Sequence, residues 1–263
     1  MKMKAFLPTF LAAMSIYSFG LAQVPEVIYK NVHKGDVVLQ YVKVNGSAGG
    51  TSADAAINSA IEKVVLRQMY GTMQKRESVQ TATQKVDDFL TKEAALLPAT
   101  RIRRVAAVLQ ADMAAQLQED RGYGVPYEHY TYDSKAKVFY NGDRYLSLMQ
   151  GLYTFFGGAH GNTLFTTLNF DTQTGKLLRL LDLFIPGSNY LQKINELVDR
   201  EEAKEAGGLF GDVVVDDEVQ FYLTEQQELV LAYQPYDVAC YARGTVLFTL
   251  PFGELQDYLA ISY

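Results

Sequence analysis

Hydrophobic and polar residues alternate along two short stretches near residue 30. Val27–Val32 and Val37–Val44 show this period of two, and Lys34, Gly35 and Asp36 form a turn-like connection between them. Alternation is typical of strands that have one buried face, and a short connection containing glycine joins antiparallel neighbours. The pattern therefore predicts a β-hairpin.

From residue 51 the apolar positions take up the period of a helix. Thr51 and Asp54 have the spacing of a capping pair at a helix start. Residues 79–120 are rich in alanine, glutamine and charge, and Pro98 interrupts them. We expect helices over these segments, the first of which buries one face made of Ile57, Ile61, Val64, Val65 and Met69.

Beyond residue 126 short β-rich segments alternate with turn residues. The expected strands cover 127–133, 137–140, 145–156, 164–170, 177–181, 219–223, 228–233 and 245–250, with clear turns at 141–143 and 171–175. A helix is expected from Ser188 to a left-handed stop at Gly207, and a short helix near Leu255 ends the chain. Because helices and strands come in separate runs, the pattern predicts an α+β fold with mainly antiparallel sheets, packed helices and two closely associated subdomains.

The first 22 residues have the pattern of a secretory signal. Lys2 and Lys4 precede an uncharged run, and the small residues Gly20 and Ala22 precede Gln23. The alternative is an uncleaved membrane anchor, which the shortness and polar dilution of the run disfavour. We expect an exported protein with a signal peptide at 1–22, an N-terminal companion domain at 23–122 and a C-terminal domain at 123–263, without a later membrane span.

Charge and cysteine content narrow the possible partners. The net charge is −6, and removal of Lys2 and Lys4 with the signal would leave 22 basic and 30 acidic residues, a charge of −8. An acidic chain disfavours nucleic acid as a partner and suits a basic one. Cys240 is the single cysteine, so no internal disulfide forms, and its neighbours suggest a buried apolar role.

The chain lacks the sequence patterns of common enzymes and cofactor-binding proteins. No HExxH, paired-cysteine, P-loop, GxGxxG or GxSxG motif is present. We therefore predict no catalysis, cofactor or metal. The acidic residues Asp212, Asp216, Asp217 and Glu218 lack the alternating oxygen ligands of a calcium loop and are expected in a solvated loop.

A glycine-rich segment, Gly157–Asn162, lies between two expected strands. Small residues allow a tight turn or a close approach of the backbone. Its interpretation as a structural turn is favoured, and catalysis by His160, oriented by Asp171 or Asp182, is the alternative. The residues assigned to the structural motif are Gly157, Gly158, Gly161, Asp171, Gly175 and Asp182, and those assigned to ligand binding are Tyr153, His160 and Asn162.

Aromatic content gives a second indication of binding. The chain has 18 tyrosines and no tryptophan, and many of the tyrosines fall within residues 123–153. Tyrosine offers rigid amphipathic contact area, although residues that cover a sheet would give the same composition.

Residues 127–259 resemble the C-terminal domain of RsiV-type lysozyme-sensing anti-sigma factors, a module also found beside the catalytic domain of PdaC-type deacetylases. The N-terminal part resembles the companion domain of that module less closely. The blocks that carry the resemblance are Phe156–Thr163, Asn169–Lys176, Leu180–Phe184, Phe221–Thr224, Tyr236–Val238, Tyr241–Gly244 and Phe252–Leu255.

The resemblance implies an α+β fold, no catalysis by the module itself and, in the anti-sigma factors, lysozyme binding. The chain departs from them in lacking a sigma-binding segment and a spanning helix, and from the deacetylases in lacking the deacetylase domain. We therefore expect a non-enzymatic envelope protein that binds a basic protein such as lysozyme or a peptidoglycan fragment. A hydrolase with His160 as base and a purely structural protein are the alternatives.

The first prediction concerns export. In its native host the mature protein should begin near Gln23, because the charged start and the small residues before it match a signal-peptidase site. Mass-spectrometric sequencing of the N-terminus tests this. An intact Met1 in a carbonate-resistant membrane fraction would contradict it.

Overall fold

The computed structural model describes residues 23–73, 78–202 and 208–261. The expected signal peptide and Gly207 lie outside these residues. The first part of the chain forms a sheet and three helices: β1 (Glu26–Lys34), β2 (Val37–Asn45), α1 (Gly50–Thr72), α2 (Val79–Lys92), α3 (Pro98–Gly122), β3 (Thr131–Asn141), β4 (Tyr145–Phe155) and β5 (Asn162–Asp171).

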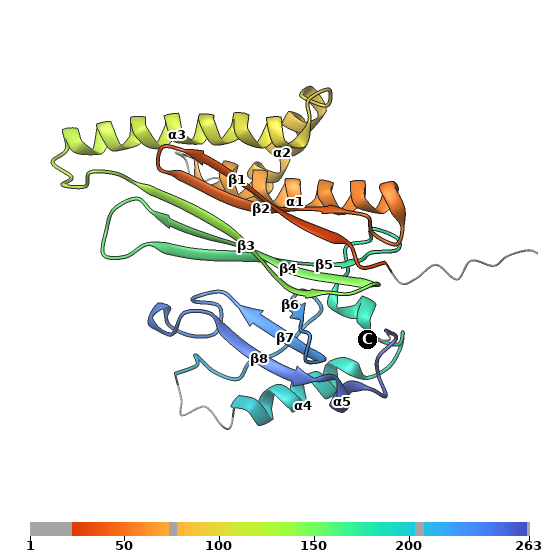
Figure 1. Cartoon of the computed structure of the whole chain (residues 1–263). Coiled ribbons are helices and arrows are strands. Elements are labelled where there is room, and N and C mark those ends of the chain that lie inside the picture. The colour runs from red at the N-terminus through yellow and green to blue at the C-terminus, as the bar shows by residue number, and fades with distance from the viewer. Residues whose placement is uncertain (1–22, 74–77, 203–207, 262–263) are drawn as a thin grey trace, which may run out of the picture.

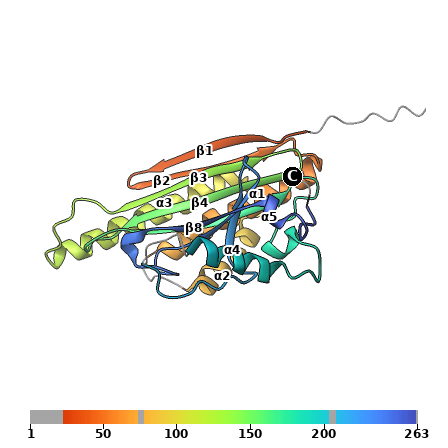
Figure 2. The same cartoon turned by 90° about the horizontal axis from the view of Figure 1, so that it is seen from below.

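The five strands pair in the order β1-β2-β3-β4-β5, as Figure 2 shows for the first four. Every pair is antiparallel except β2–β3, which are parallel over Val37–Leu39. This pair joins the expected hairpin to the later strands, so the sheet and its core continue across residue 122.

The second part of the chain forms a smaller sheet with its own helix. Its elements are η1 (Leu180–Leu183), α4 (Tyr190–Glu202), β6 (Gln220–Leu223), β7 (Glu228–Tyr233), η2 (Tyr241–Arg243), β8 (Val246–Pro251) and α5 (Phe252–Leu255). The three strands are antiparallel in the order β6-β7-β8. The structure therefore confirms the expected α+β class with mainly antiparallel sheets.

The layers are arranged around the larger sheet. Helices α1–α3 cover one face, the smaller sheet lies against the other, and α4 and α5 lie beyond it (Figure 1). One core fills the space between the helices and the larger sheet, and a second lies between the smaller sheet and α4. A small third cluster, which includes Phe165, Tyr222 and Val230, packs between the two sheets. Among the described residues, no helix is long and apolar enough to cross a bilayer.

Two expectations about strands are wrong. Segments 127–133 and 137–140 do not form separate strands, because Tyr132, Ser134 and Ala136 continue one buried face through β3. Segment 177–181 forms no strand: Leu177 makes a single bridge to Phe170 and a 3-10 turn begins at Leu180. The chain turns there because Asp182 accepts a hydrogen bond from the backbone N–H of Arg179.

The start of α1 also differs from the expected capping pair. The helix begins after Gly49, which makes no side-chain cap. Asp54 accepts hydrogen bonds from the backbone N–H groups of Gly46 and Ser47 instead. These bonds fix the loop before the helix and hold the pKa of Asp54 below its usual value, although burial alone would raise it.

The edge of β5 is closed by side chains from the smaller sheet. The Gln234 amide accepts from the backbone N–H of Phe165 at 3.0 Å and donates to its C=O at 2.7 Å. Gln220 accepts from the N–H of Thr167 at 2.8 Å. An open strand edge invites pairing with other chains, and these amides occupy it.

A buried polar network lies next to this edge. Asn169 donates to the C=O of Phe221 at 2.8 Å and accepts from the Ser147 hydroxyl. The Ser147 oxygen accepts in turn from the N–H of Leu223 at 2.9 Å. Asn169 is 2% exposed and Ser147 fully buried, so each group depends on its partners for hydrogen bonds. The network fixes how the two sheets meet.

The second prediction tests this network. Asn169→Leu should lower the free energy of unfolding by about 2–4 kcal/mol, because it removes the side-chain donor to the Phe221 carbonyl and the acceptor for the Ser147 hydroxyl proton inside a buried interface. Urea denaturation measures the loss. Asn31→Leu, at an exposed position on β1, is the matched control and should change stability by less than about 0.5 kcal/mol. Equal losses in both variants would contradict the account.

Candidate functional site

The glycine block forms the connection between β4 and β5. Gly157 and Gly158 adopt φ of 86° and 91°, which side chains other than glycine rarely adopt. The Tyr127 hydroxyl donates to the C=O of Gly158 at 3.1 Å and accepts from its N–H at 3.0 Å. The Tyr127 ring also occupies the space where a Cβ on Gly157 would lie. One tyrosine thus holds the first half of the loop.

The second half of the loop is held from the smaller sheet. The Nδ1 of His160 lies 2.8 Å from the C=O of Gly161, which also accepts from the Tyr241 hydroxyl. The rings of His160 and Tyr241 stack, with centroids 4.0 Å apart. The Tyr153 ring lies against Gly161, where any larger residue would strike it. These contacts give His160 a fixed orientation.

Beside the loop a hollow of about 360 Å³ opens between the end of α1 and the ends of β4 and β5. His160 and Asn162 both line it, and both are exposed. Tyr153 does not line it, because alternation along β4 directs Leu152 and Thr154 to this side. The full lining is Gly71, Thr72, Leu152, Thr154, Phe156, Gly157, His160, Asn162 and Leu164.

The hollow is polar and is lined by no carboxylate, ammonium or guanidinium group. Thr72, Thr154 and Asn162 can each donate and accept hydrogen bonds, and apolar side chains such as Leu164 and Phe156 lie among them. None of the nine lining residues is an aspartate, glutamate, lysine or arginine. Such a site suits a neutral ligand that carries both hydroxyl or amide groups and apolar faces.

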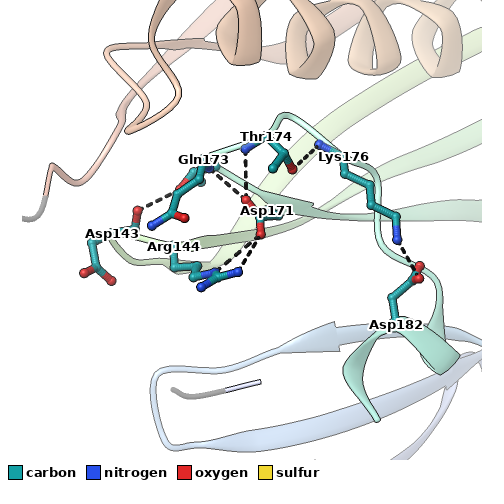
Figure 3. Close-up of polar contacts among 8 residues, drawn as sticks. Asp143, Arg144, Asp171, Gln173, Thr174, Lys176 and Asp182 are labelled. Carbon is teal, nitrogen blue, oxygen red and sulfur yellow. Dashed lines mark hydrogen bonds and ion pairs between the residues drawn. The ribbon is translucent and has the colours of Figure 1, made fainter. Parts of the chain in front are cut away.

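Asp171 ends β5 and Asp182 lies in the segment that follows it (Figure 3). His160 precedes the start of the same strand, so neither aspartate orients it. A ten-residue strand spans about 30 Å, which separates the two ends. Asp171 accepts from the backbone N–H groups of Gln173 and Thr174 at 2.9 and 3.0 Å and pairs with Arg144 at 3.3 Å. It therefore organises the turn that follows β5.

Asp182 and Gly175 belong to the same turn region. Asp182 binds Lys176 at 2.6 Å and the N–H of Arg179 at 2.9 Å. Burial works to raise the pKa of Asp182, but these partners outweigh it and lower that pKa. Gly175 adopts φ of 74° where the turn meets Ala53 of α1, too closely for a side chain.

Several other expectations about sites can be compared with the structure. Cys240 is exposed, so the prediction of a buried role is wrong; only Ala239 beside it enters the core. Among the acidic residues, Asp217 accepts from Tyr190 and Asp216 from the N–H of Glu218. No group of three metal-ligating side chains occurs within the described ranges.

The tyrosines of 123–153 divide between core and surface. Tyr130, Tyr132 and Tyr145 are buried. Tyr123 and Tyr153 are 82% and 41% exposed. Most of this cluster covers the sheet, and only its exposed members remain available to a partner.

The sequence pattern did not indicate the residues that α1 and β4 contribute to the hollow. Gly71 and Thr72 end a helix more than 80 positions before the loop, and nothing in their local pattern marks them. Alternation could have placed Leu152 and Thr154 opposite Tyr153, since the strand itself was expected.

Two protein families match successive parts of the chain. Residues 36–163 match the family described as "Deacetylase PdaC", and residues 181–253 match "Protein of unknown function (DUF3298)". The first match ends at residue 163 and the second begins at residue 181; between them the chain passes from the first core, which includes Phe170, to the second, which includes Leu178. They confirm the resemblance to the PdaC-associated module, whereas no match assigns the chain to the RsiV-type anti-sigma factors.

Two solved structures are similar over most of the chain. A DUF3298 family member from Bacteroides fragilis has a TM-score of 0.53 and 19% identity and covers 91% of this chain and 94% of its own. A DUF3298 family protein from Pseudomonas aeruginosa has a TM-score of 0.48 and 15% identity, with 90% and 94% covered. No curated protein sequence matches. The first similarity supports the fold and carries no activity with it.

The third prediction concerns the glycine loop. Gly158→Val should lower the free energy of unfolding by about 1–3 kcal/mol, because a β-branched residue is strained at φ of 91° even though the space around it is open. His160→Ala should cost less, about 0.5–1.5 kcal/mol, because it removes one stacked pair and one hydrogen bond near the surface. Urea denaturation of the two variants measures both losses of stability and ranks them.

Gly211→Val is the control, because Gly211 has neither a positive φ nor a close neighbour. Suppose instead that both loop variants unfold like the parent and a cell-wall hydrolase activity disappears only in His160→Ala. That result would replace the structural interpretation of the loop with the catalytic one.

Proposed function

We propose that the protein is a non-enzymatic, exported binding protein of the cell envelope, and that the hollow beside the glycine loop binds a neutral cell-wall glycan. The observation that carries this proposal is the lining of the hollow. It combines uncharged hydrogen-bonding side chains with apolar ones in a volume of about 360 Å³, within the usual range of small-ligand sites.

A sugar presents hydroxyl and acetamido groups around its ring and apolar C–H faces above and below it. Asn162 and Thr154 can bond the former, while Phe156 and Leu164 offer contact to the latter. A charged ligand would lose hydration in the hollow without meeting an opposite charge, which is unfavourable. Neutral acetamido sugars therefore fit this lining best.

The loop is also held rigid in advance of binding. Tyr127 fixes Gly158, and Tyr241 both stacks on His160 and bonds Gly161. A site that is ordered before binding loses less conformational freedom when the ligand enters. This rigidity favours recognition by the loop.

The hydrolase alternative receives less support from the geometry. A general base is normally oriented by a carboxylate or backbone group and directed at a nucleophile or water. Here the Gly161 carbonyl can orient the His160 ring through Nδ1, but no serine or cysteine nucleophile lines the hollow, and the two proposed aspartates lie at the other end of β5. Its position in the hollow wall fits a hydrogen-bonding residue for a ligand.

A basic protein such as lysozyme is the second candidate partner. The acidic excess favours it, since the expected mature chain carries −8. The exposed rings of Tyr29, Tyr123 and Tyr153 offer aromatic anchors. Binding of this kind would use the outer surface rather than the hollow, and salt would slow the association because it screens the attraction.

The fourth prediction concerns binding of tetra-N-acetylchitotetraose, a neutral acetamido sugar, measured by calorimetry. The parent should bind it saturably, and Asn162→Ala should weaken binding about tenfold, because the amide contributes one or two hydrogen bonds. The affinity should change little between 0.05 and 0.5 M salt, since the ligand has no charge.

Asn31→Ala, far from the hollow on β1, is the matched control and should bind like the parent. Absence of saturable binding at 10 mM sugar would remove the glycan proposal. If immobilised lysozyme then binds with an association rate that falls as salt rises, the second candidate replaces it.

A further inference from the structure

A second pocket, of about 470 Å³, lies on the opposite flank of the molecule. It opens between the β1–β2 hairpin, the first half of α1 and the start of α3. It shares no residue with the hollow beside the glycine loop, which lies at the other end of α1.

The pocket exists because β2 separates from β3. Their pairing ends at Leu39, and beyond it β2 turns its inner edge toward α1. Asn58 of α1 then replaces the missing strand: it accepts from the N–H of Val44 at 2.8 Å and donates to its C=O at 2.7 Å. The splayed hairpin leaves room between itself and the helices, and the bonds of Asn58 keep that room open.

One wall of the pocket is a buried ion pair. Glu62 is 4% exposed and binds Arg101 through two bonds of 2.7 Å. Arg101 also donates to the C=O of Leu96. Two parallel bonds hold such a pair firmly. The positive charge of Arg101 balances the negative charge of Glu62. This carboxylate therefore does not neutralise the other cations at the pocket.

The rim carries two further cations. Lys30 and Lys43 lie on the same face of the hairpin at diagonal positions, since Lys30 pairs with Tyr41 and Lys43 is two residues farther along β2. Diagonal neighbours are about 7–8 Å apart. Within the described part of the chain neither lysine forms a salt bridge, although the charge of Lys43, together with hydrogen bonds from Gly46 and Ser47, lowers the pKa of Asp54 against the effect of burial. Two like charges thus face an open pocket in a protein whose net charge is −6.

Apolar surface adjoins these cations. Leu97 lines the pocket at the start of α3 and is 74% exposed, and Ala55 is exposed on the α1 side. Tyr41 contributes its ring to the interior. An occupant that brought an apolar body against Leu97 and Ala55 would bury apolar surface that now meets water.

We propose that this pocket binds a small amphipathic anion, whose charged group lies between Lys30 and Lys43 and whose apolar body packs against Tyr41, Leu97 and Ala55. The anion removes the repulsion between the two lysines, and the apolar contacts add to the binding energy. The volume suits a molecule of small-ligand size. This site is independent of the glycan proposal.

Calorimetry with decanoate tests the proposal on the mature chain. The parent should bind one decanoate per chain, and decyltrimethylammonium, with an alkyl chain one carbon longer and the opposite charge, should bind at least tenfold more weakly. The double variant Lys30→Gln/Lys43→Gln should lose about tenfold in decanoate affinity, because two partly exposed charge contacts disappear.

Two further variants separate the pocket from the rest of the surface. Lys34→Gln removes an exposed lysine of β1 that does not line the pocket and should bind decanoate like the parent. Ala55→Phe places a ring at the mouth from an exposed helix position and should abolish binding while the thermal midpoint stays close to that of the parent. The proposal is overturned by no saturable binding below 10 mM, by equal binding of the cation, or by an equal loss in Lys34→Gln.

Discussion

The arrangement of the molecule depends on how the edge of β5 is closed. Strand pairing ends at this edge, yet the backbone groups of Phe165 and Thr167 bond the side-chain amides of Gln234 and Gln220. Asn169 and Ser147 extend the same kind of bonding into the buried interface between the sheets. A second sheet that docks through side-chain amides can lie face to face with the first without continuing it, and this geometry sets the four layers.

The same docking positions the glycine loop. Tyr241, from the smaller sheet, reaches the loop at Gly161 and His160, while Tyr127 holds it from the segment before β3. The hollow therefore depends on both parts of the chain, because its walls come from α1, β4 and β5 and its loop is fixed from the smaller sheet. The pocket at the hairpin has a different origin, since it forms where β2 leaves β3 and Asn58 takes over the bonding.

The local sequence pattern was sufficient to predict most helices and strands, but it did not predict the contacts between them. The hairpin, α1, the break at Pro98 and, except for segment 177–181, the strands from Tyr145 onward follow from period and turn residues. The parallel β2–β3 pair and the amide bonds to β5 join residues far apart in sequence, which periodicity does not encode. At the candidate site, the glycine loop, His160 and Asn162 were found from composition, whereas Thr72 of α1 was not. Cys240 was misjudged because its apolar neighbours pack inward while it turns outward.

The central claim is that the hollow beside the glycine loop is a ligand site built by this docking. Titration of tetra-N-acetylchitotetraose into isotope-labelled protein, followed by amide chemical shifts, tests it most directly. The account predicts shifts concentrated at Gly71, Thr72 and residues 152–164, with the amides of the hairpin unmoved. Saturable shifts located only elsewhere on the molecule, or none at 10 mM sugar, would contradict it.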